Sequence, residues 1–305
     1  MGTNLIGRFS VSTPTEMEIK LRSSMLRRTE LKEIRWSPGR EMEARSLEWE
    51  RQLQEIHELK APEGKKALII TQVDKFPLLE KWAKGIYYYH DFYDEEAAQW
   101  SLLLDSGPIG LWIVGKPTIV EMELINHKMA KNIENIALHY QTLNAAQAEL
   151  GRASNGFYLS HGVIDLPYSV HEESIARFEG HPLQLSLLIE MYMDARKEIE
   201  TTSLISGTRA MLAASLFIPG SSMSKIRLQH REVAGMPGEE SVLRIKEGDS
   251  RNLVFTWRFN GKYDSGEYPT TRIEMESPDG NLDEKLQIWD AILDSMKPMF
   301  VRKPS

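Results

Sequence analysis

The amino-acid sequence predicts an α+β fold of two domains, each a mainly antiparallel sheet packed with amphipathic helices. Three observations lead to this prediction. A chain of 305 residues exceeds the usual size of one compact domain. Its second half contains strictly alternating apolar residues, which are typical of strands with one buried face. Both halves also contain segments with apolar residues three and four positions apart, which is the spacing of one helical face.

The first domain, residues 1–150, is expected to mix helices with strands. A helix is predicted over 39–60, because Ser37-Pro38 precedes it and Pro62 and Gly64 end it. Strands are predicted at 66–73, 85–93 and 110–116. The last two of these segments are rich in aromatic and β-branched residues, which favour strands.

A long amphipathic helix is predicted over 119–144. Thr118 and Glu121 fit a capping box, in which a hydroxyl and a carboxylate satisfy backbone donors at the start of a helix. One apolar stripe runs along the segment and consists of Met122, Ile125, Met129, Ile133, Ile136, Tyr140 and Leu143.

A polar stretch with two glycines, residues 151–156, separates the halves and places the second domain at 151–305. Helices are expected at 202–216 and at the end of the domain, where Lys297-Pro298 stops the last one. The residues of this last helical face are Leu282, Leu286, Trp289, Leu293 and Met296. Alternation predicts strands through Leu183–Met193, Leu253–Phe259 and Thr271–Met275.

Composition and charge exclude several classes of protein. The net charge of −7 is spread over both halves, so neither half is a basic nucleic-acid-binding module. No segment approaches the roughly 20 apolar residues that span a bilayer. The absence of cysteine excludes disulfides, thiolate nucleophiles and Cys-ligated zinc. The chain opens Met1-Gly2-Thr3-Asn4 without the regions of a signal peptide, so we expect a cytoplasmic protein or a trimmed mature one.

Motifs for catalysis, cofactors or metals are not found in the sequence. The Gly-x-Ser-x-Gly elbow of serine hydrolases is missing, and Ser222-Met-Ser-Lys225 lacks the companion elements of its motif class. His127 and His139 are too far apart on one helix to share a metal, and the other histidines are dispersed. No glycine-rich loop has phosphate-binding spacing. We therefore predict no catalytic residues, no cofactor and no metal, although catalytic groups can also be distant in sequence.

A candidate partner-binding patch is the aromatic and acidic segment around residue 93. Its aromatic side chains could anchor a partner and its carboxylates could give specificity, whereas core packing is the commoner role of such aromatics. The predicted partner-binding residues are Asp91, Phe92, Tyr93, Asp94 and Glu95.

One segment of the second half, Arg231-Glu-Val-Ala-Gly-Met-Pro-Gly-Glu-Glu240, resembles a turn-and-strand element of a known family. The family comprises the immunity proteins that neutralise type VI secretion phospholipase effectors, and the resemblance lies in their C-terminal domain. Further segments look like successive parts of the same domain and cover nearly the whole second half: Gly156-Phe-Tyr-Leu, Gly180-His-Pro, Leu253–Gly261 and Ile288–Pro298. The first half matches less specifically, through Ile6-Gly-Arg-Phe-Ser.

The resemblance implies a non-catalytic, two-domain periplasmic protein that binds a cognate lipase effector, and it presumes that a signal peptide has been removed. Inhibition would follow from steric occlusion of the lipase or from locking of its lid between the two domains. Gly235 and Gly238 would permit a tight turn, and Glu239 and Glu240 receive no catalytic role. Two other classes stay open, namely an envelope hydrolase with dispersed catalytic residues and a structural envelope module.

Overall fold

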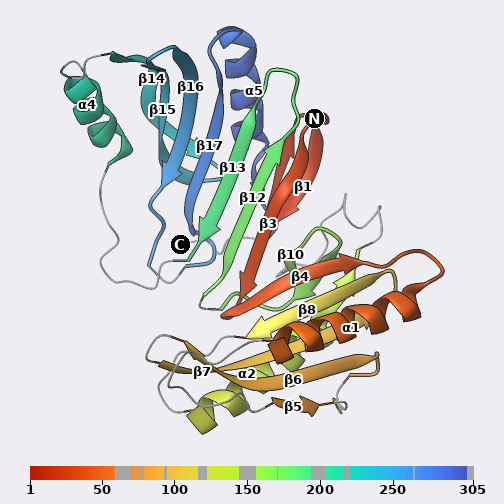
Figure 1. The fold of residues 1–305 in the computed structure, drawn as a ribbon. Coiled ribbons are helices and arrows are strands. Elements are labelled where there is room, and N and C mark those ends of the chain that lie inside the picture. Colours follow the sequence, from red (N-terminus) through yellow and green to blue (C-terminus); the bar gives the residue numbers. More distant parts are fainter. Residues whose placement is uncertain are drawn as a thin grey trace. The chain divides into compact units, whose positions relative to one another are not determined.

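The computed structural model describes residues 1–300 except for 59–69, 74–75, 77–78, 93–94, 116–121, 144–155, 170, 194–202, 216, 218–219 and 264. The chain divides into two compact units (Figure 1). Unit 1 contains Met1–Ser23 and Tyr168–Ser305, and unit 2 contains Ser24–Pro167. Every strand pair whose register is described is antiparallel. The predicted α+β class with antiparallel sheets is confirmed.

The compact units do not follow the predicted division at residue 150, because the first 23 residues pack with the second half of the chain. The hairpin of β1 (Gly2–Ile6) and β2 (Phe9–Thr13) pairs with β18 (Lys297–Pro298) near the end of the chain. A local change in composition reveals a linker, but it contains no information about pairing between the two ends of a chain.

A buried ion pair also ties this N-terminal hairpin to unit 1. Arg8 donates two hydrogen bonds to the Glu172 carboxylate, each 2.7 Å long, and the two side chains are only 6% and 8% exposed. The amide of Ser169 donates to the same carboxylate. The bidentate geometry satisfies both charges, as burial of an ion pair requires.

The main sheet of unit 1 has the order β14-β15-β16-β17-β13-β12, with β3 beside β12. These strands are β3 (Glu18–Leu26), β12 (Glu173–Glu179), β13 (Ser186–Tyr192), β14 (Ser221–Val233), β15 (Met236–Glu247), β16 (Ser250–Phe259) and β17 (Thr270–Pro278). Alternate residues of β13, β16 and β17 are buried, which confirms the three predicted alternating strands.

Two helices of unit 1 confirm the predicted ones with shifted ends. Helix α4 spans Leu204–Ser215 and contacts β14 and β15. Helix α5 spans Leu282–Ser295. Its residues Trp289, Ile292 and Leu293 belong to the same core cluster as the buried side chains of the unit 1 sheet and of the N-terminal hairpin. The predicted stop at Lys297-Pro298 coincides with β18, because Pro298 ends the helical pattern and its neighbours pair with β2.

Unit 2 contains the other main sheet, in the order β4-β8-β7-β6-β5, and a small sheet ordered β10-β11-β9. The main sheet comprises β4 (Thr29–Arg35), β5 (Ile70–Val73), β6 (Ala83–Phe92), β7 (Glu95–Ser106) and β8 (Ile109–Gly115). The small sheet comprises β9 (Tyr140–Thr142), β10 (Gly156–Tyr158) and β11 (Gly162–Asp165). The part of the predicted strand 66–73 before residue 70 lies outside the described residues.

Helices pack against both faces of the unit 2 sheet. Helix α1 (Glu41–Glu58) buries Trp49 and Ile56 in one core cluster, which includes Trp112 of β8. Helix α2 (Met122–His139) contributes Met129 and Ile133 to the other cluster. Strand β8 is buried at all seven positions, because alternate residues enter the two clusters.

The helix predicted over 119–144 ends earlier than expected. Tyr140 continues the apolar stripe by spacing, but it begins β9 and pairs with Ile164 of β11. Its hydroxyl donates a 2.8 Å hydrogen bond to Glu33. Burial is the main cause that raises the pKa of Tyr140, and the negative charge of Glu33 is the second. The proposed capping pair Thr118 and Glu121 lies outside the described residues. No described helix is long and apolar enough to span a membrane.

Candidate functional site

The residues that carry the family resemblance, Arg231–Glu240, form the turn and adjoining strands between β14 and β15, and we call them the signature hairpin. Val233 ends β14, Met236 begins β15, and these two residues pair on either side of the turn. Gly235 in the turn has a φ of 72°, a left-handed conformation that glycine adopts without steric cost. The predicted role of Gly235 in a tight turn is confirmed.

Gly238 has a different role from the predicted one, because it lies within β15 and outside the turn. A Cβ atom at this position would lie 2.4 Å from the ring of Trp257. The indole of Trp257 donates a 2.9 Å hydrogen bond to the carbonyl of Arg231. Gly238 therefore allows the Trp257 ring to cross β15 closely, and the prediction that it shapes the turn is wrong.

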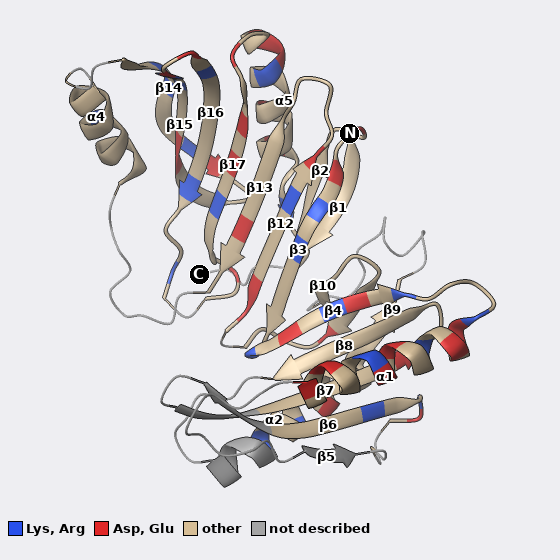
Figure 2. Ribbon diagram, viewed as in Figure 1, with Lys and Arg blue, Asp and Glu red and all other residues tan. Residues whose placement is uncertain are grey.

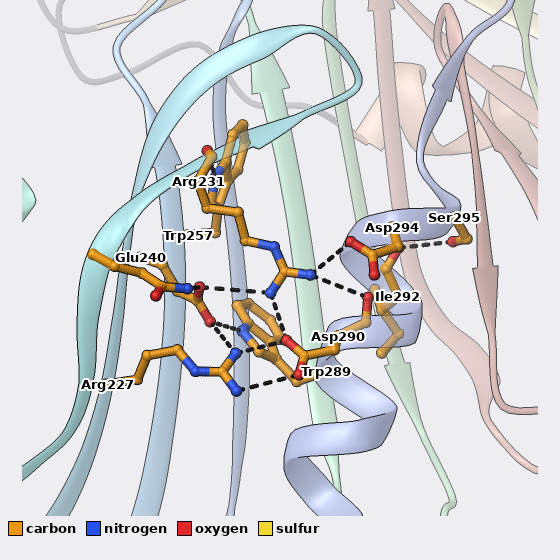
Figure 3. Close-up of polar contacts among 10 residues, drawn as sticks. Arg227, Arg231, Glu240, Trp257, Trp289, Asp290, Ile292, Asp294 and Ser295 are labelled. Atoms are coloured by element: carbon orange, nitrogen blue, oxygen red, sulfur yellow. Dashed lines mark hydrogen bonds and ion pairs between the residues drawn. The ribbon is translucent and has the colours of Figure 1, made fainter.

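Glu240, the last residue of the signature hairpin, is fully buried (0% exposed) and accepts hydrogen bonds from three side chains. Trp289 Nε1 of α5 donates at 2.8 Å and Arg227 Nη1 at 2.9 Å (Figure 3). Gln229 Nε2 donates at 2.8 Å. A buried carboxylate requires such donors, because removal from water destabilises the charge strongly.

The two arginines extend this cluster to the surface of α5. Arg227 Nη1 and Arg231 Nη1 contact Asp290 Oδ1 at 2.6 and 2.5 Å, and Arg231 Nη2 contacts Asp294 at 2.7 Å (Figure 3). We call the set Arg227, Arg231, Glu240, Trp289, Asp290 and Asp294 the Glu240 network. It fixes α5 against the signature hairpin through charge-assisted hydrogen bonds.

The neighbouring Glu239 holds the other helix, α4, because successive side chains of a strand point to opposite faces. Its carboxylate accepts 3.0 Å hydrogen bonds from the amide of Ile205 and the hydroxyl of Ser203 at the start of α4. Thr208 of α4 also donates to Ser241. Two adjacent glutamates of the signature hairpin thus anchor two helices.

The charges within the Glu240 network shift the pKa of Asp290 on α5. Partial burial raises the pKa of Asp290, but hydrogen bonds from Arg227 and Arg231 outweigh it, and the pKa lies below its ordinary value. The hydrogen bond to Asp290 is in turn the main cause that raises the pKa of Arg227. These shifts keep Asp290 and Arg227 charged at neutral pH.

An acid titration should reveal the contribution of Asp290. A group with a lowered folded pKa stabilises the protein above its unfolded pKa, about 3.9 for Asp, and this stabilisation is lost as the pH falls through the folded value. We expect Asp290→Asn to lower the free energy of unfolding in urea at pH 6 and to have progressively less effect from about pH 4 downward. Asp294→Asn, at an exposed position, is the matched control and should change little. A loss that stays constant down to about pH 2.5 would contradict this assignment.

As far as the structure describes them, the predicted partner-binding residues belong to the paired ends of β6 and β7. Figure 2 labels these two strands within unit 2. Phe92 pairs with Glu95 across this hairpin, and Asp91 pairs with Glu96. Tyr93 and Asp94 lie outside the described residues. The structure does not test whether these residues bind a partner, and their role stays a prediction.

The residues considered for chemistry are not assembled into a site. Ser222–Lys225 lie inside strand β14, whereas the nucleophile of a Ser-x-x-Lys enzyme opens a helix. Within the described part of the chain, no three His, Asp or Glu residues are placed to hold a metal ion. Sequence reasoning missed Arg227, Asp290 and Asp294 of the Glu240 network. Asp290 and Asp294 are four positions apart, which places them on one face of a helix, and Arg227 and Arg231 are four positions apart on one face of a strand. These two spacings are the local signals that could have indicated the network.

Residues 153–299 match the family described as Tle cognate immunity protein 4 C-terminal domain. No curated protein sequence matches the chain. The fold is similar to that of the apo immunity protein TplEi of the type VI secretion system (T6SS) of Pseudomonas aeruginosa. The TM-score is 0.76 at 18% sequence identity, over 98% of this chain and 97% of that chain.

Two structures of complexes have the same fold. TplEi from Pseudomonas aeruginosa complexed with an "L" peptide gives a TM-score of 0.69 at 17% identity, over 98% of each chain. The Tle4–Tli4 complex gives 0.75 at 18% identity, again over 98% of each chain. The family match includes the signature hairpin, the Glu240 network and the closing helix. Residues 153–299 are thus similar to the Tle cognate immunity protein 4 C-terminal domain, and the fold of the chain is that of the two T6SS immunity proteins.

Proposed function

We propose that the chain is an immunity protein that binds and inhibits a cognate type VI secretion phospholipase effector and so protects the cell that produces it. The observation that carries this proposal is the family match over 153–299, whose signature hairpin is built into the core through Glu240. The solved complex of the similar Tli4 with Tle4 supports a partner of the Tle class.

The proposed mechanism requires no chemistry from this chain. Binding occludes the lipase active site or locks its lid, with both units contributing to an interface larger than roughly 1,000 Å². The residues at the β6–β7 hairpin, Asp91 to Glu95, are proposed as part of this interface. The site of action is proposed to be the periplasm, where a phospholipase effector reaches its lipid.

A titration of a candidate phospholipase effector of the Tle class with the purified protein tests this function. Because the inhibitor acts by tight binding, lipase activity should fall linearly with added protein and vanish near one molar equivalent, with a stable complex in size-exclusion chromatography. Full activity of a demonstrably active effector at excess protein would overturn the proposal. Lipid turnover by the purified protein alone would instead favour the envelope hydrolase.

A further inference from the structure

Helix α4 presents apolar side chains to solvent and holds the sheet mainly through polar contacts. Phe217, just after the helix, is 85% exposed and Met211 is 55% exposed. The residues of α4 that are buried on the sheet are Ile205, Thr208 and Ser215. A usual surface helix keeps its apolar residues on the side that faces the core, whereas α4 also exposes apolar side chains on its other side. We call Arg209, Ala210, Met211, Ala213, Ala214 and Phe217 the α4 outer face; all six residues are exposed.

The orientation of α4 is fixed by the hydrogen bonds that hold it. The Glu239 carboxylate binds the first turn through Ile205 N, and Thr208 binds Ser241 one turn later. These contacts determine which side of the helix meets the sheet, so the apolar side chains cannot turn inward without breaking them. An apolar face that is held outward in this way is typical of an interaction surface.

Positive charge borders this face. Arg209 is the one charged residue of α4, and Lys225 of β14 pairs in register with Leu243, two positions beyond Ser241 on the same face of the sheet. Both cations are exposed, and the ion pairs of the described residues include neither of them. The face thus carries two cations in a chain whose net charge is −7.

We propose that the α4 outer face docks onto an apolar surface of the effector that also bears carboxylates. This inference rests on the proposed function and names the surface through which part of the binding occurs. A phospholipase works at a bilayer surface and has to present apolar side chains there, which Met211 and Phe217 match. Carboxylates on the partner complement Arg209 and Lys225.

Two other occupants fit the face less well. An anionic bilayer strengthens binding only about fivefold per Lys or Arg, and stable attachment of a protein to lipid needs more than one short apolar helix with two cations. A second copy of the chain would bring the cations of both copies into one interface without a carboxylate from either α4. Both alternatives are outcomes of the test.

The test uses the full-length protein with Met211→Glu and Phe217→Glu combined. Because both side chains are exposed, the melting temperature should stay unchanged, whereas the Kd for the cognate phospholipase effector should rise roughly 30-fold or more, as for loss of a binding hot spot. The matched control is Met42→Glu with Leu47→Glu, which adds the same charge at exposed apolar positions of α1 in unit 2. Its Kd should stay within about threefold of the wild-type value.

Arg209→Glu separates charge from apolar contact and should raise Kd about tenfold, mainly by slowing association at low salt. Wild-type affinity of the α4 double variant, in an assay where the wild-type protein binds, overturns the docking surface and leaves the proposed function intact. A wild-type protein that neither binds nor inhibits the effector removes the proposed function itself. Wild-type binding to vesicles of phosphatidylglycerol, or dimerisation in sedimentation velocity, that the double variant abolishes would assign the face to lipid or to a second copy and overturn the inference.

Discussion

Deletion of residues 1–23 is expected to unfold unit 1 while unit 2 stays folded. The deleted segment contributes four core side chains, Ile6, Phe9, Val11 and Met17, to the unit 1 cluster. Burial of this set is worth up to roughly 6–12 kcal/mol, which is similar to the whole stability of a domain. The buried Glu172 also loses Arg8, its only cation among the described ion pairs.

Fluorotryptophan NMR distinguishes the two units in this experiment. Of the 7 tryptophans, Trp257 and Trp289 lie in unit 1 and the others in unit 2. The deletion should collapse the dispersion of these two resonances and leave the other five in place. Substitution of Ile19 and Leu21 by serine is the control, because these side chains are exposed within the same segment. Native shifts for Trp257 and Trp289 in the deletion variant would contradict the assignment of residues 1–23 to unit 1.

The substitution Glu240→Ala is expected to destabilise unit 1 by about 3–5 kcal/mol, the usual cost of breaking a buried ion pair. It removes the acceptor of Trp289 Nε1 and leaves Arg227 and Arg231 facing a cavity. Urea unfolding, followed through the same two tryptophan resonances, measures the loss of free energy.

Two matched variants interpret the Glu240 result. Glu240→Gln keeps an oxygen for Trp289 and loses the charge, so its cost should be smaller. Glu239→Ala, one residue earlier, removes only the anchor of α4 and should cost about 1 kcal/mol, as the loss of a helix cap does. Equal losses for Glu239→Ala and Glu240→Ala would contradict the central role of the Glu240 network.

The sequence predicts most elements of this fold because their apolar patterns are local. The alternation in Leu253–Phe259 and the helical face from Leu282 to Leu293 identify β16 and α5 without any knowledge of their partners. Tyr140 shows the limit of this reasoning, because its spacing continues a helix while its pairing with Ile164 makes it a strand residue. Tertiary contacts override a local period at such positions.

Long-range pairing explains the other differences. The contact of Arg8 with Glu172 joins residues 164 positions apart, and that of Arg227 with Asp290 joins residues 63 positions apart. Neither spacing corresponds to a helical or strand period. The resemblance of Arg231–Glu240 to a turn-and-strand element predicts the hairpin of β14 and β15. The roles of Glu239 and Glu240 as anchors of two helices depend on contacts between residues that are distant in sequence.

The pairing of β2 with β18 has a consequence for the order in which the chain acquires its structure. Unit 2 is continuous in sequence and can condense as soon as residue 167 has emerged from the ribosome or on the far side of a membrane, whereas the first hairpin must wait for strand Lys297–Pro298. During synthesis at roughly 5–20 residues per second, this wait lasts on the order of 15–60 s. During that time Ile6, Phe9 and Val11 have no native partner from the end of the chain, and a prematurely terminated polypeptide never obtains one. Unit 1 can thus be completed only after β18 has been synthesised.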